Sequence, residues 1–345
     1  MTVTTLRGCD QPLAVAYDTA LLDLDGVVYI GEQPVAGAAA ALEAARRKGM
    51  STAFVTNNAS RTAETIAAHL VELGVPARPD EVVTSSMAAA TLLAAELPAG
   101  STVLVVGGEG LHAAVRERGL VGTEVDAEAV IAVVQGYGPN VSWRLLAEAA
   151  LAIQRGVPWV ATNLDTTLPS PRGLLPGNGS LVAALVTATG RKPISAGKPE
   201  IALHNEAVRR SGARHPLVVG DRLDTDIEGA VRAATDSLLV LTGVTDAHAL
   251  LAAPVDKRPT YIAADLSGLN MSHPAVGVDG RSAACRGWRA SLAGNVIELA
   301  RTAEVVEPFD ALRAVVAAAW LGDGTQPRLR GETAALDGLG LTGLV

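Results

Sequence analysis

The 345-residue sequence is poor in aromatic residues, which make up only 3% of it. Proteins that hold single-stranded nucleic acids usually stack the bases on aromatic side chains. The formal net charge is −8, and the chain has no long run of basic residues. A general electrostatic attraction to nucleic acid or to an anionic membrane surface is therefore not expected.

Cysteine is also scarce, with only Cys9 and Cys285 in the chain. They lie far apart in the sequence and form neither a metal-ligand spacing nor a disulfide framework. The N-terminal residues have no apolar signal core, and no uncharged apolar run reaches membrane-spanning length. We therefore expect a reduced, cytoplasmic protein without membrane insertion.

Hydrophobic residues are abundant, at 49% of the sequence, so the chain can fill sizeable cores, built mainly from Ala, Val and Leu. Its length suits two or three domains. Apolar strand patterns alternate with helical ones, which favours a parallel sheet covered by helices. The patterns predict strands at 20–24, 52–56, 82–85, 102–106, 130–135, 157–161, 216–219 and 237–241, and helices at 37–48, 62–73, 86–96, 110–118, 142–155, 179–189, 200–211 and 225–234.

The most informative segment is the predicted strand at 20–24 and the residues after it. Asp23 and Asp25 are two residues apart, and Gly26 follows them. Residues i and i+2 of a straight strand point to the same side, and glycine allows a turn there. Two carboxylates so close are costly unless a cation or a reaction uses them. Taken alone, the segment is equally compatible with an ordinary strand followed by an acidic turn.

Three later segments add polar groups beside glycine, proline or a predicted strand end. The strand at 52–56 ends in Thr56 and is followed by Asn57, and Lys198 stands between a glycine and a proline. The strand at 216–219 leads into an acidic loop with Asp221 and Asp226.

These four segments, in this order, resemble the four motifs of the haloacid dehalogenase (HAD) superfamily of phosphotransferases. The wordings Asp-Gly-Val-Val-Tyr, Thr-Asn-Asn and Gly-Asp-Arg-Leu-x-Thr-Asp resemble its C2-capped class IIA branch. That branch contains nitrophenyl phosphatases, phosphoglycolate phosphatases and glycerol-3-phosphate phosphatases. The resemblance covers residues 15–270.

The resemblance implies an α/β fold with a Rossmann-like, doubly wound parallel sheet as its core and an inserted α/β cap domain. We expect the HAD-like catalytic core at 1–99 and 193–272 and the C2-type cap at 100–192. A small C-terminal α+β extension of unknown role would occupy 273–345, and the resemblance does not reach it. Chains of this kind place the active site at the carboxyl ends of the core strands.

The resemblance also assigns roles to the carboxylates. Asp23 would be the nucleophile that forms an aspartyl-phosphate, and Asp25 would act as general acid and then as general base. Asp23, the backbone carbonyl of Asp25 and Asp221 would bind Mg²⁺. Asp226 would support the metal or Lys198, whereas Asp224 is interpreted as a solvated loop residue or a helix N-cap.

Lys198 would pair with a phosphoryl oxygen and with Asp23, which keeps the nucleophile ionised. Thr56 and Asn57 would donate hydrogen bonds to the phosphoryl oxygens. These roles predict a Mg²⁺-dependent phosphatase that hydrolyses a small phosphate monoester. Glycerol 3-phosphate is the leading substrate, and 2-phosphoglycolate or a broad 4-nitrophenyl phosphatase activity is the alternative.

Substrate choice should lie in the cap, where Ala161-Thr162-Asn163-Leu164-Asp165 resembles the Ala-Thr-Asn-x-Asp wording of the branch. Gly173–Gly179 is interpreted as a hinge or pocket-forming loop. Relatives often have an Asp-Arg pair where this chain has Gly138-Pro139, which weakens any transfer of cap specificity. The family often dimerises through the cap, so a homodimer of that kind is an option here.

Two other classes of protein compete with the phosphatase. A mutase would transfer the phosphoryl group to an alcohol and would need a cap that excludes water. A non-enzymatic binding module would be expected to lack the nucleophile, yet Asp23, Asp25, Lys198 and Asp221 are all present.

Overall fold

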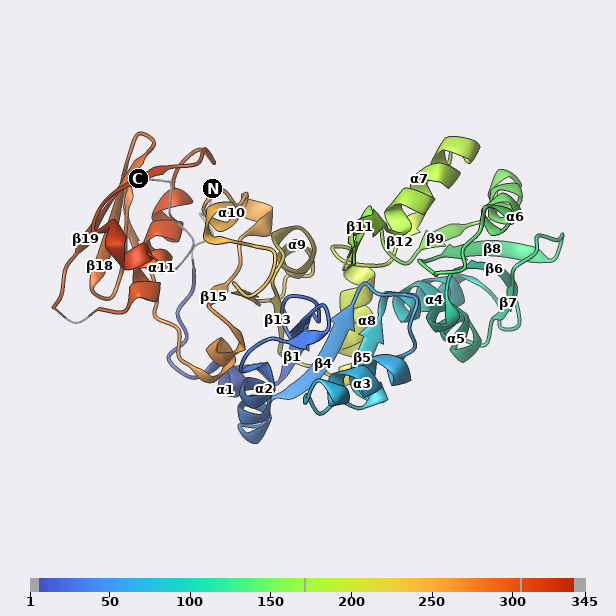
Figure 1. Cartoon of the computed structure of the whole chain (residues 1–345), viewed down its shortest axis with the longest axis horizontal. Helices are drawn as coiled ribbons and strands as arrows, with labels where there is room; N and C mark the ends of the chain where they lie inside the picture. Colours follow the sequence, from blue (N-terminus) through green and yellow to red (C-terminus); the bar gives the residue numbers. More distant parts are fainter. Residues whose placement is uncertain (1–5, 171, 305, 338–345) are drawn as a thin grey trace. The chain divides into compact units, whose positions relative to one another are not determined.

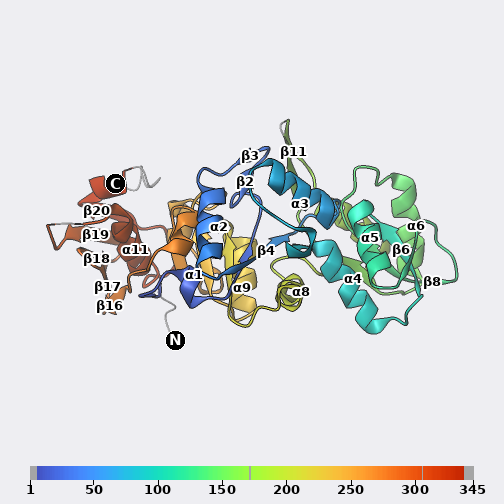
Figure 2. The same ribbon diagram turned by 90° about the horizontal axis from the view of Figure 1, so that it is seen from below.

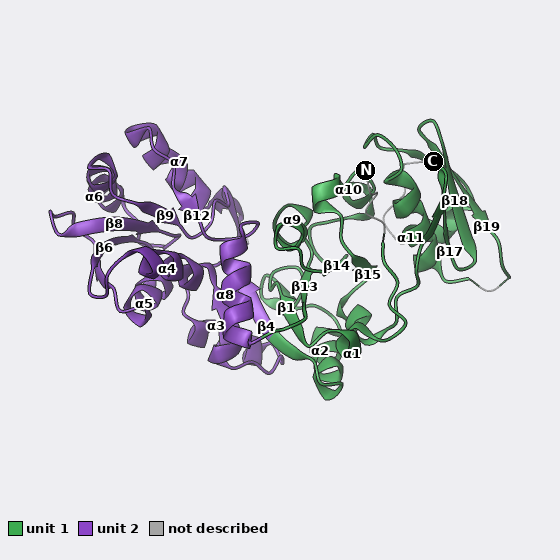
Figure 3. Cartoon of the chain, turned by 180° about the vertical axis from the view of Figure 1, so that it is seen from behind, with its two compact units in different colours: residues 1–52, 213–345 green, residues 53–212 purple. Residues whose placement is uncertain are grey.

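The computed structural model describes residues 6–170, 172–304 and 306–337. It divides into two compact units, coloured differently in Figure 3. The first unit comprises residues 1–52 and 213–345, and the second comprises residues 53–212. Within the described ranges, no helix combines the length and the apolar character that a bilayer crossing requires.

The main sheet has six strands in the order β15-β14-β13-β1-β4-β5. The pairs β1–β13, β13–β14, β14–β15 and β4–β5 are all parallel. This parallel α/β sheet confirms the predicted fold class. The strands are β1 (Thr19–Leu22), β4 (Ser51–Thr56), β5 (Val82–Thr84), β13 (Pro216–Gly220), β14 (Ser237–Val240) and β15 (Tyr261–Ala263).

The strands of this sheet are short apolar runs, as expected for strands covered on both faces. All four residues of β1 and all four of β14 are buried. Leu22 of β1 lies opposite Val219 of β13. The two strands therefore end side by side, and the polar residues after them leave the same edge of the sheet.

Helix ends follow the signals in the sequence. Helix α2 (Ala38–Arg47) has Arg46 and Arg47 in its last turn, where cations suit the helix dipole. Gly49 after it has φ 98°, a left-handed conformation that favours glycine. Gly74, after α3 (Ala63–Glu72), has φ 80°. A left-handed glycine thus follows both helices. The other helices of the first unit are α1 (Leu13–Ala16), α9 (Glu228–Arg232), α10 (Ala247–Leu251) and α11 (Pro308–Ala319).

The helix predicted at 225–234 differs from the structure. Residues Leu223–Ile227 form a π-helical turn, and α9 begins only at Glu228. The amide of Ile227 donates to the carbonyl of Arg222 at 3.2 Å, five residues back. The carboxylate of Asp226 accepts from the amide of Arg222 at 3.2 Å. This wider turn directs Asp226 back toward the end of β13, which an ordinary helix start would not do.

The second unit contains a sheet of five parallel strands in the order β12-β9-β8-β6-β7. Its helices α6 and α7 cover one face, where a hydrophobic cluster includes Leu104, Val133, Ile153 and Leu185. The strands are β6 (Thr102–Val106), β7 (Val121–Thr123), β8 (Val130–Gln135), β9 (Trp159–Ala161) and β12 (Ile194–Ser195). The helices of this unit, besides α3, are α4 (Ser85–Glu96), α5 (Glu109–Glu117), α6 (Trp143–Gln154), α7 (Asn178–Thr189) and α8 (Ile201–Ser211).

Two hairpins were not predicted. Strands β2 (Tyr29–Ile30) and β3 (Gln33–Pro34) pair in the first unit. In the second unit β10 (Thr167–Ser170) pairs with β11 (Gly173–Pro176). The stretch Gly173–Gly179, interpreted as a loop, is therefore partly a strand. All of β11 is exposed, so it has no buried apolar face from which a strand could be predicted.

The C-terminal segment is an α+β structure, as expected. Strands β16 to β20 form one sheet beside helix α11, as Figures 1 and 2 show. All neighbours in this sheet are antiparallel except β19 and β20, which are parallel. The strands are β16 (Gly277–Asp279), β17 (Ser282–Cys285), β18 (Trp288–Ala293), β19 (Val296–Arg301) and β20 (Arg328–Gly331).

The compact units do not follow the expected domains. The second unit joins the expected cap to parts of the expected core, including α3, β5 and α8, and the extension shares the first unit with the rest of the core. The predicted boundaries at 99/100, 192/193 and 272/273 stay a prediction.

Glu206 is the centre of a buried ion cluster in the second unit. Its side chain, 1% exposed, accepts hydrogen bonds from Arg118, Arg209 and Arg210 at 2.6–2.7 Å. Burial acts to raise the pKa of Glu206, but the hydrogen bonds from Arg209 and Arg210 outweigh it and lower this pKa. A lowered folded-state pKa stabilises the protein above the unfolded value, and this contribution is lost as the pH falls.

We predict that Glu206→Gln lowers the free energy of unfolding at pH 7 by about 3 kcal/mol, because it leaves the arginines without their carboxylate. The deficit should shrink below pH ~4, near the unfolded pKa of glutamate, where wild type also loses the charge. Urea denaturation at several pH values measures both effects. Glu43→Gln is the control, since its pair with Arg47 is exposed and should contribute little. A deficit that is the same at pH 3 and pH 7 would contradict the electrostatic explanation.

Candidate active site

Three carboxylates meet where β1 and β13 end. Asp23 follows β1 directly, and its amide donates to the carbonyl of Val219 at 2.8 Å. Asp221 follows β13, and Asp226 lies in the π-helical turn behind it. One carboxylate oxygen from each of the three residues lies within 4.8 Å of the others. Asp221 and Asp226 are buried, and Asp23 is partly exposed, so the cluster opens toward solvent at Asp23.

Glycines provide the space for these carboxylates. A Cβ on Gly26, which has φ +82°, would lie 2.5 Å from Oδ2 of Asp221. A Cβ on Gly243 would overlap the same carboxylate, and one on Gly220 would overlap the carboxylate of Asp226. The site therefore depends on glycine at three places where the backbone closely approaches a carboxylate.

The loop after β14 holds Asp221 in place. The amide of Val244 donates to Oδ2 of Asp221 at 2.6 Å, and the amide of Thr245 donates to its carbonyl at 3.1 Å. The hydroxyl of Thr242 donates to the carbonyl of Gly26 at 2.5 Å. We did not predict this loop from the sequence. Its only signal is a threonine and a glycine directly after a predicted strand.

The cluster fits a small divalent cation. Like charges at this distance destabilise one another, and a cation among them reverses that cost. All of the donors are hard carboxylate oxygens, the ligands that Mg²⁺ prefers. Asp224 stays outside the cluster, since it is 55% exposed and pairs with Arg222 at 2.9 Å.

Asp25 lies in the turn after β1, outside the cluster, and its side chain is exposed. The expectation that Asp23 and Asp25 point to one side assumed a straight strand, but β1 ends at Leu22. From Leu24 the chain turns, with the amides of Val27 and Val28 both donating to the carbonyl of Leu24. The roles predicted for the Asp25 side chain and carbonyl stay predictions.

The second unit contains Thr56, Asn57 and Lys198. The hydroxyl of Thr56, at the end of β4, accepts from the amide of Asn58 at 3.0 Å. Oδ1 of Asn57 accepts from the amide of Lys198 at 2.8 Å, and its Nδ2 donates to the carbonyl of Lys198 at 3.3 Å. The side-chain amide of Asn57 therefore fixes the backbone of Lys198.

The same amide reaches the predicted cap. Nδ2 of Asn57 also donates to Oδ2 of Asp165 at 3.2 Å. Nδ2 of Asn163 donates to the carbonyl of Asn57 at 2.7 Å. A Cβ on Gly197 would lie 2.6 Å from Oδ1 of Asn57, so glycine is required beside this network. We expected the Asn57 amide to donate to a phosphoryl oxygen, but here it donates to Asp165 and Lys198.

The predicted site residues thus form two groups, each within one unit. Asp23, Asp221 and Asp226 form the carboxylate cluster of the first unit, with Asp25 in the adjoining turn. Asn57, Lys198 and Asp165 form a hydrogen-bond network in the second unit, with Thr56 next in sequence to Asn57. From the sequence, Asp165 was identified only as part of the Ala-Thr-Asn-x-Asp motif in the predicted cap, and no role was assigned to it.

Three family models match parts of the chain. Residues 20–121 match a family model described as haloacid dehalogenase-like hydrolase, and residues 195–269 match one described as HAD-hydrolase-like. Residues 285–341 match a model described as GCN5-related N-acetyltransferase like domain, which the sequence reasoning did not anticipate.

The chain belongs to the haloacid dehalogenase-like hydrolases, as the sequence motifs indicated. Among curated proteins, it is 48% identical over 317 residues to a D-glycerol 3-phosphate phosphatase of Mycobacterium tuberculosis. That alignment covers 90% of this chain and 88% of the relative.

Solved structures are similar as well. A crystal structure of a glycerol phosphate phosphatase from Mycobacterium tuberculosis with magnesium has a TM-score of 0.87 and 44% identity. The structural alignment covers 96% of this chain and 99% of the chain in that crystal structure. A p-nitrophenyl phosphatase from Archaeoglobus fulgidus has a TM-score of 0.68 and 29% identity. That alignment covers 73% of this chain and 98% of the phosphatase chain.

We predict that Asn57→Asp destabilises the second unit. It replaces the amide that donates to Asp165 and Lys198 with a carboxylate, which faces Asp165 directly. The expected loss is about 1–3 kcal/mol in the free energy of unfolding at pH 7. Asp165→Asn in the same chain would supply a donor again, so the second change should cost less in the Asn57→Asp background than in wild type. Additive losses in a double-mutant cycle would refute the direct interaction.

Proposed function

We propose that this chain is a Mg²⁺-dependent phosphatase that hydrolyses a small phosphate monoester through an aspartyl-phosphate. The observation that carries the proposal is the cluster of Asp23, Asp221 and Asp226, each with an oxygen within 4.8 Å of the others. Phosphoryl transfer depends mainly on positioning and on neutralising negative charge. A partly exposed carboxylate beside two buried ones combines a nucleophile with a cation site.

The metal would be held by Asp23, the backbone carbonyl of Asp25 and Asp221, with Asp226 in support. When bound, Mg²⁺ supplies positive charge that offsets the negative charge of the nucleophile and of the phosphate. Asp23 attacks phosphorus in line with the leaving oxygen and becomes covalently attached to the phosphoryl group. Water then releases inorganic phosphate and restores the carboxylate.

Asp25 serves as the proton carrier. As general acid it protonates the leaving alkoxide, and as general base it takes a proton from the water that attacks the aspartyl-phosphate. Its exposed position in the turn after β1 is consistent with proton exchange with solvent between the two steps.

Lys198 and Thr56 bind the phosphoryl oxygens, Asn57 positions Lys198, and Lys198 keeps Asp23 ionised. The contribution of Asn57 acts largely through Lys198, because its side-chain amide bonds to both backbone polar groups of that residue. Asp165 is a positioning residue in the same network.

Glycerol 3-phosphate is the proposed substrate, and its hydrolysis would give the chain a place in glycerol metabolism. The support is the 48% identity to a D-glycerol 3-phosphate phosphatase over 90% of the chain. A phosphoglycolate phosphatase or a broad 4-nitrophenyl phosphatase is the second candidate, because the similarity to a p-nitrophenyl phosphatase covers 73% of the chain.

We also propose that the protein works in the cytoplasm. Cys9 and Cys285 are both free thiols, which suits a reducing compartment. Burial raises the pKa of Cys285 to about 12, so this thiol stays protonated and unreactive at neutral pH.

The first test is phosphate release from a panel of phosphate monoesters, with Mg²⁺ and with EDTA. We expect glycerol 3-phosphate to have the highest kcat/KM, and both EDTA and Asp23→Asn to abolish turnover. Asp224→Asn is the matched control, because this aspartate is exposed in the same region and should stay active. A preference for phosphoglycolate would keep the mechanism and change the substrate. Absence of metal-dependent release from every ester would overturn the proposal.

The role of Asp25 predicts a dependence on the leaving group. Asp25→Asn should slow hydrolysis of glycerol 3-phosphate by about 10²–10⁴-fold, the usual contribution of a general acid. 4-Nitrophenyl phosphate should lose far less, since nitrophenolate leaves without a proton. Equal losses on both substrates would show that Asp25 does not protonate the leaving group.

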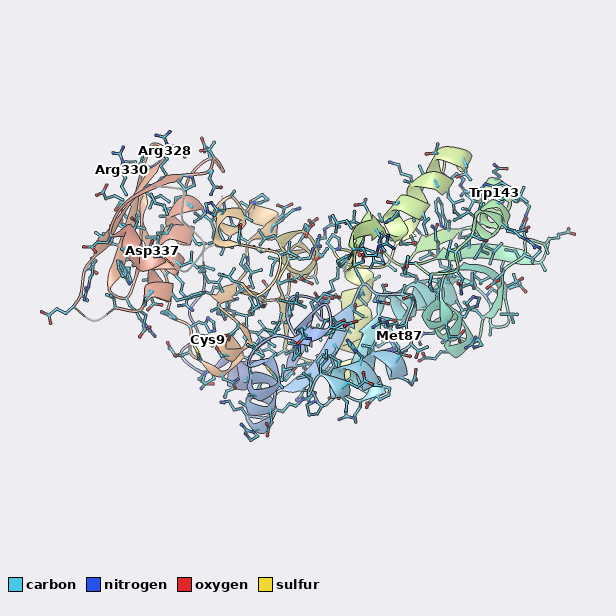
Figure 4. All side chains as sticks on the ribbon, viewed as in Figure 1. Cys9, Met87, Trp143, Arg328, Arg330 and Asp337 are labelled. Atoms are coloured by element: carbon cyan, nitrogen blue, oxygen red, sulfur yellow. The ribbon has the colours of Figure 1, made fainter. Side chains whose placement is uncertain are left out.

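We further propose that two copies associate through α6 and α7. Trp143, labelled in Figure 4, lies at the start of α6. It is 82% exposed, and Leu151 on the same helix is 54% exposed. Helix α7 carries no charged residue from Asn178 to Thr189. An exposed tryptophan beside uncharged helical surface is typical of a protein interface.

Light scattering should therefore give about twice the 35.2 kDa chain mass, and Trp143→Ser should give the single-chain mass. Val255→Ser, at an exposed position of the first unit, is the control and should remain dimeric. A wild type with the mass of one chain would exclude this dimer.

A further inference from the structure

Helix α11 of the C-terminal extension is buried on all sides. Every residue from Asp310 to Ala319 is buried, and a helix that is buried all round must lie between two covering layers. One layer is the sheet of the extension, whose strands β17, β18 and β19 contact the helix. The other layer includes α10, which belongs to the part of the first unit that also carries Asp221.

The extension therefore shares its hydrophobic core with the rest of the first unit. One continuous cluster of buried residues contains Leu312 and Val316 of α11 together with Leu239, Leu250 and Ile262. The last three come from β14, α10 and β15. The extension is thus packed against the parallel sheet.

Polar contacts fix α11 at this place. The indole nitrogen of Trp320, directly after the helix, donates to the carbonyl of Leu250 at 3.0 Å. The guanidinium of Arg313 donates to the carbonyl of Ile262 at 3.2 Å and to Asp310 at 2.7 Å. Arg258 lies over the ring of Trp320, 5.1 Å from its centroid. These directional contacts set the position of the helix along the sheet.

The shared cluster extends to the carboxylate site. Ile227, which directly follows Asp226, is a fully buried member of it. Leu223 and Leu241 are partly buried and pack against it. Leu223 belongs to the π-helical turn that carries Asp226, and Leu241 precedes the Thr242–Thr245 loop that holds Asp221. Both segments that position buried carboxylates thus lie on the same hydrophobic cluster as α11.

We propose that the C-terminal extension is a structural support for the metal site. Through the cluster it holds Ile227, Leu223 and Leu241, and thereby fixes Asp226 and Asp221. Val316 and Trp320 are positioning residues in this account, since they act through other residues. The inference rests on the proposed metal site. It assigns a role to the C-terminal extension, for which the sequence motifs indicated no function.

This role differs from what the match to an N-acetyltransferase-like model suggests. A helix N-terminus can bind an anionic cofactor through its free amides. At the start of α11, Pro308 has no amide hydrogen to donate. Asp310 in the first turn is paired with Arg313 and Arg286. The start of this helix therefore has one donor fewer for an anionic cofactor such as acetyl-CoA, and its charged side chains pair with one another.

Two adjacent valines allow a matched test. Arg313 and Trp320 bond to the carbonyls of Ile262 and Leu250, so they mark the helix face toward the parallel sheet. Val316 lies about 60° from Arg313 around the helix axis, close to that face, and Val315 lies about 200° from Arg313, on the side away from it. Both valines are fully buried, so Val316→Ala and Val315→Ala remove the same volume on two sides of the helix that are about 100° apart.

The measurement is the Kd of Mg²⁺ on the full chain by calorimetry, without substrate, together with the urea midpoint of each variant. We expect Val316→Ala to weaken Mg²⁺ binding by about threefold to tenfold, less than the roughly 10–100-fold typical of residues that bond directly to metal ligands. Val315→Ala should leave the Kd unchanged although its urea midpoint falls to a similar extent. Trp320→Phe, which removes the bond to Leu250, should act like Val316→Ala.

Equal Kd values for the two valine variants and wild type would overturn the supporting role. Binding of acetyl-CoA to the wild type in the same instrument would also overturn it, in favour of a cofactor site. A wild type that does not bind Mg²⁺ would instead contradict the proposed metal site, so failure of the proposed function and failure of this inference are distinguishable.

Discussion

The structure depends on keeping three carboxylates together at one edge of a parallel sheet. Asp23, Asp221 and Asp226 repel one another, yet the fold brings an oxygen of each within 4.8 Å of the others. Close backbone approach at Gly26, Gly220 and Gly243 makes the space, and amides of the Thr242–Thr245 loop orient Asp221. A protein maintains such a costly arrangement where a cation or a reaction uses it.

In the second unit, hydrogen bonds fix the backbone of Lys198 and connect it to the predicted cap. A single side chain, Asn57, bonds to the backbone of Lys198 and to Asp165. The C-terminal extension contributes to the first unit through packing. Helix α11 adds a hydrophobic layer on which the segments around Asp226 and Asp221 rest. Catalytic geometry in this chain therefore relies on contacts well beyond the charged residues.

The sequence predicted the parts of the fold that depend on local periodicity. Strands such as β6 and β8 were predicted to the residue because buried parallel strands are continuous apolar runs. It did not predict the π-helical turn at Leu223–Ile227, in which the carboxylate of Asp226 accepts from the amide of Arg222. Nor did it predict the Asn57–Asp165 contact, since residues 108 positions apart leave no periodic signal. The exposed position of Asp25 was missed because the strand was expected to continue beyond Leu22.

The most direct test of the central claim is thermal unfolding of wild type and Asp221→Asn, each in EDTA and in Mg²⁺. If the carboxylates are held together for a cation, Asp221→Asn should relieve repulsion and raise the Tm in EDTA. It should also abolish the rise in Tm that Mg²⁺ gives the wild type. A variant with a lower Tm in EDTA and an undiminished response to Mg²⁺ would contradict the account, because the cluster would then be neither repulsive nor the metal site.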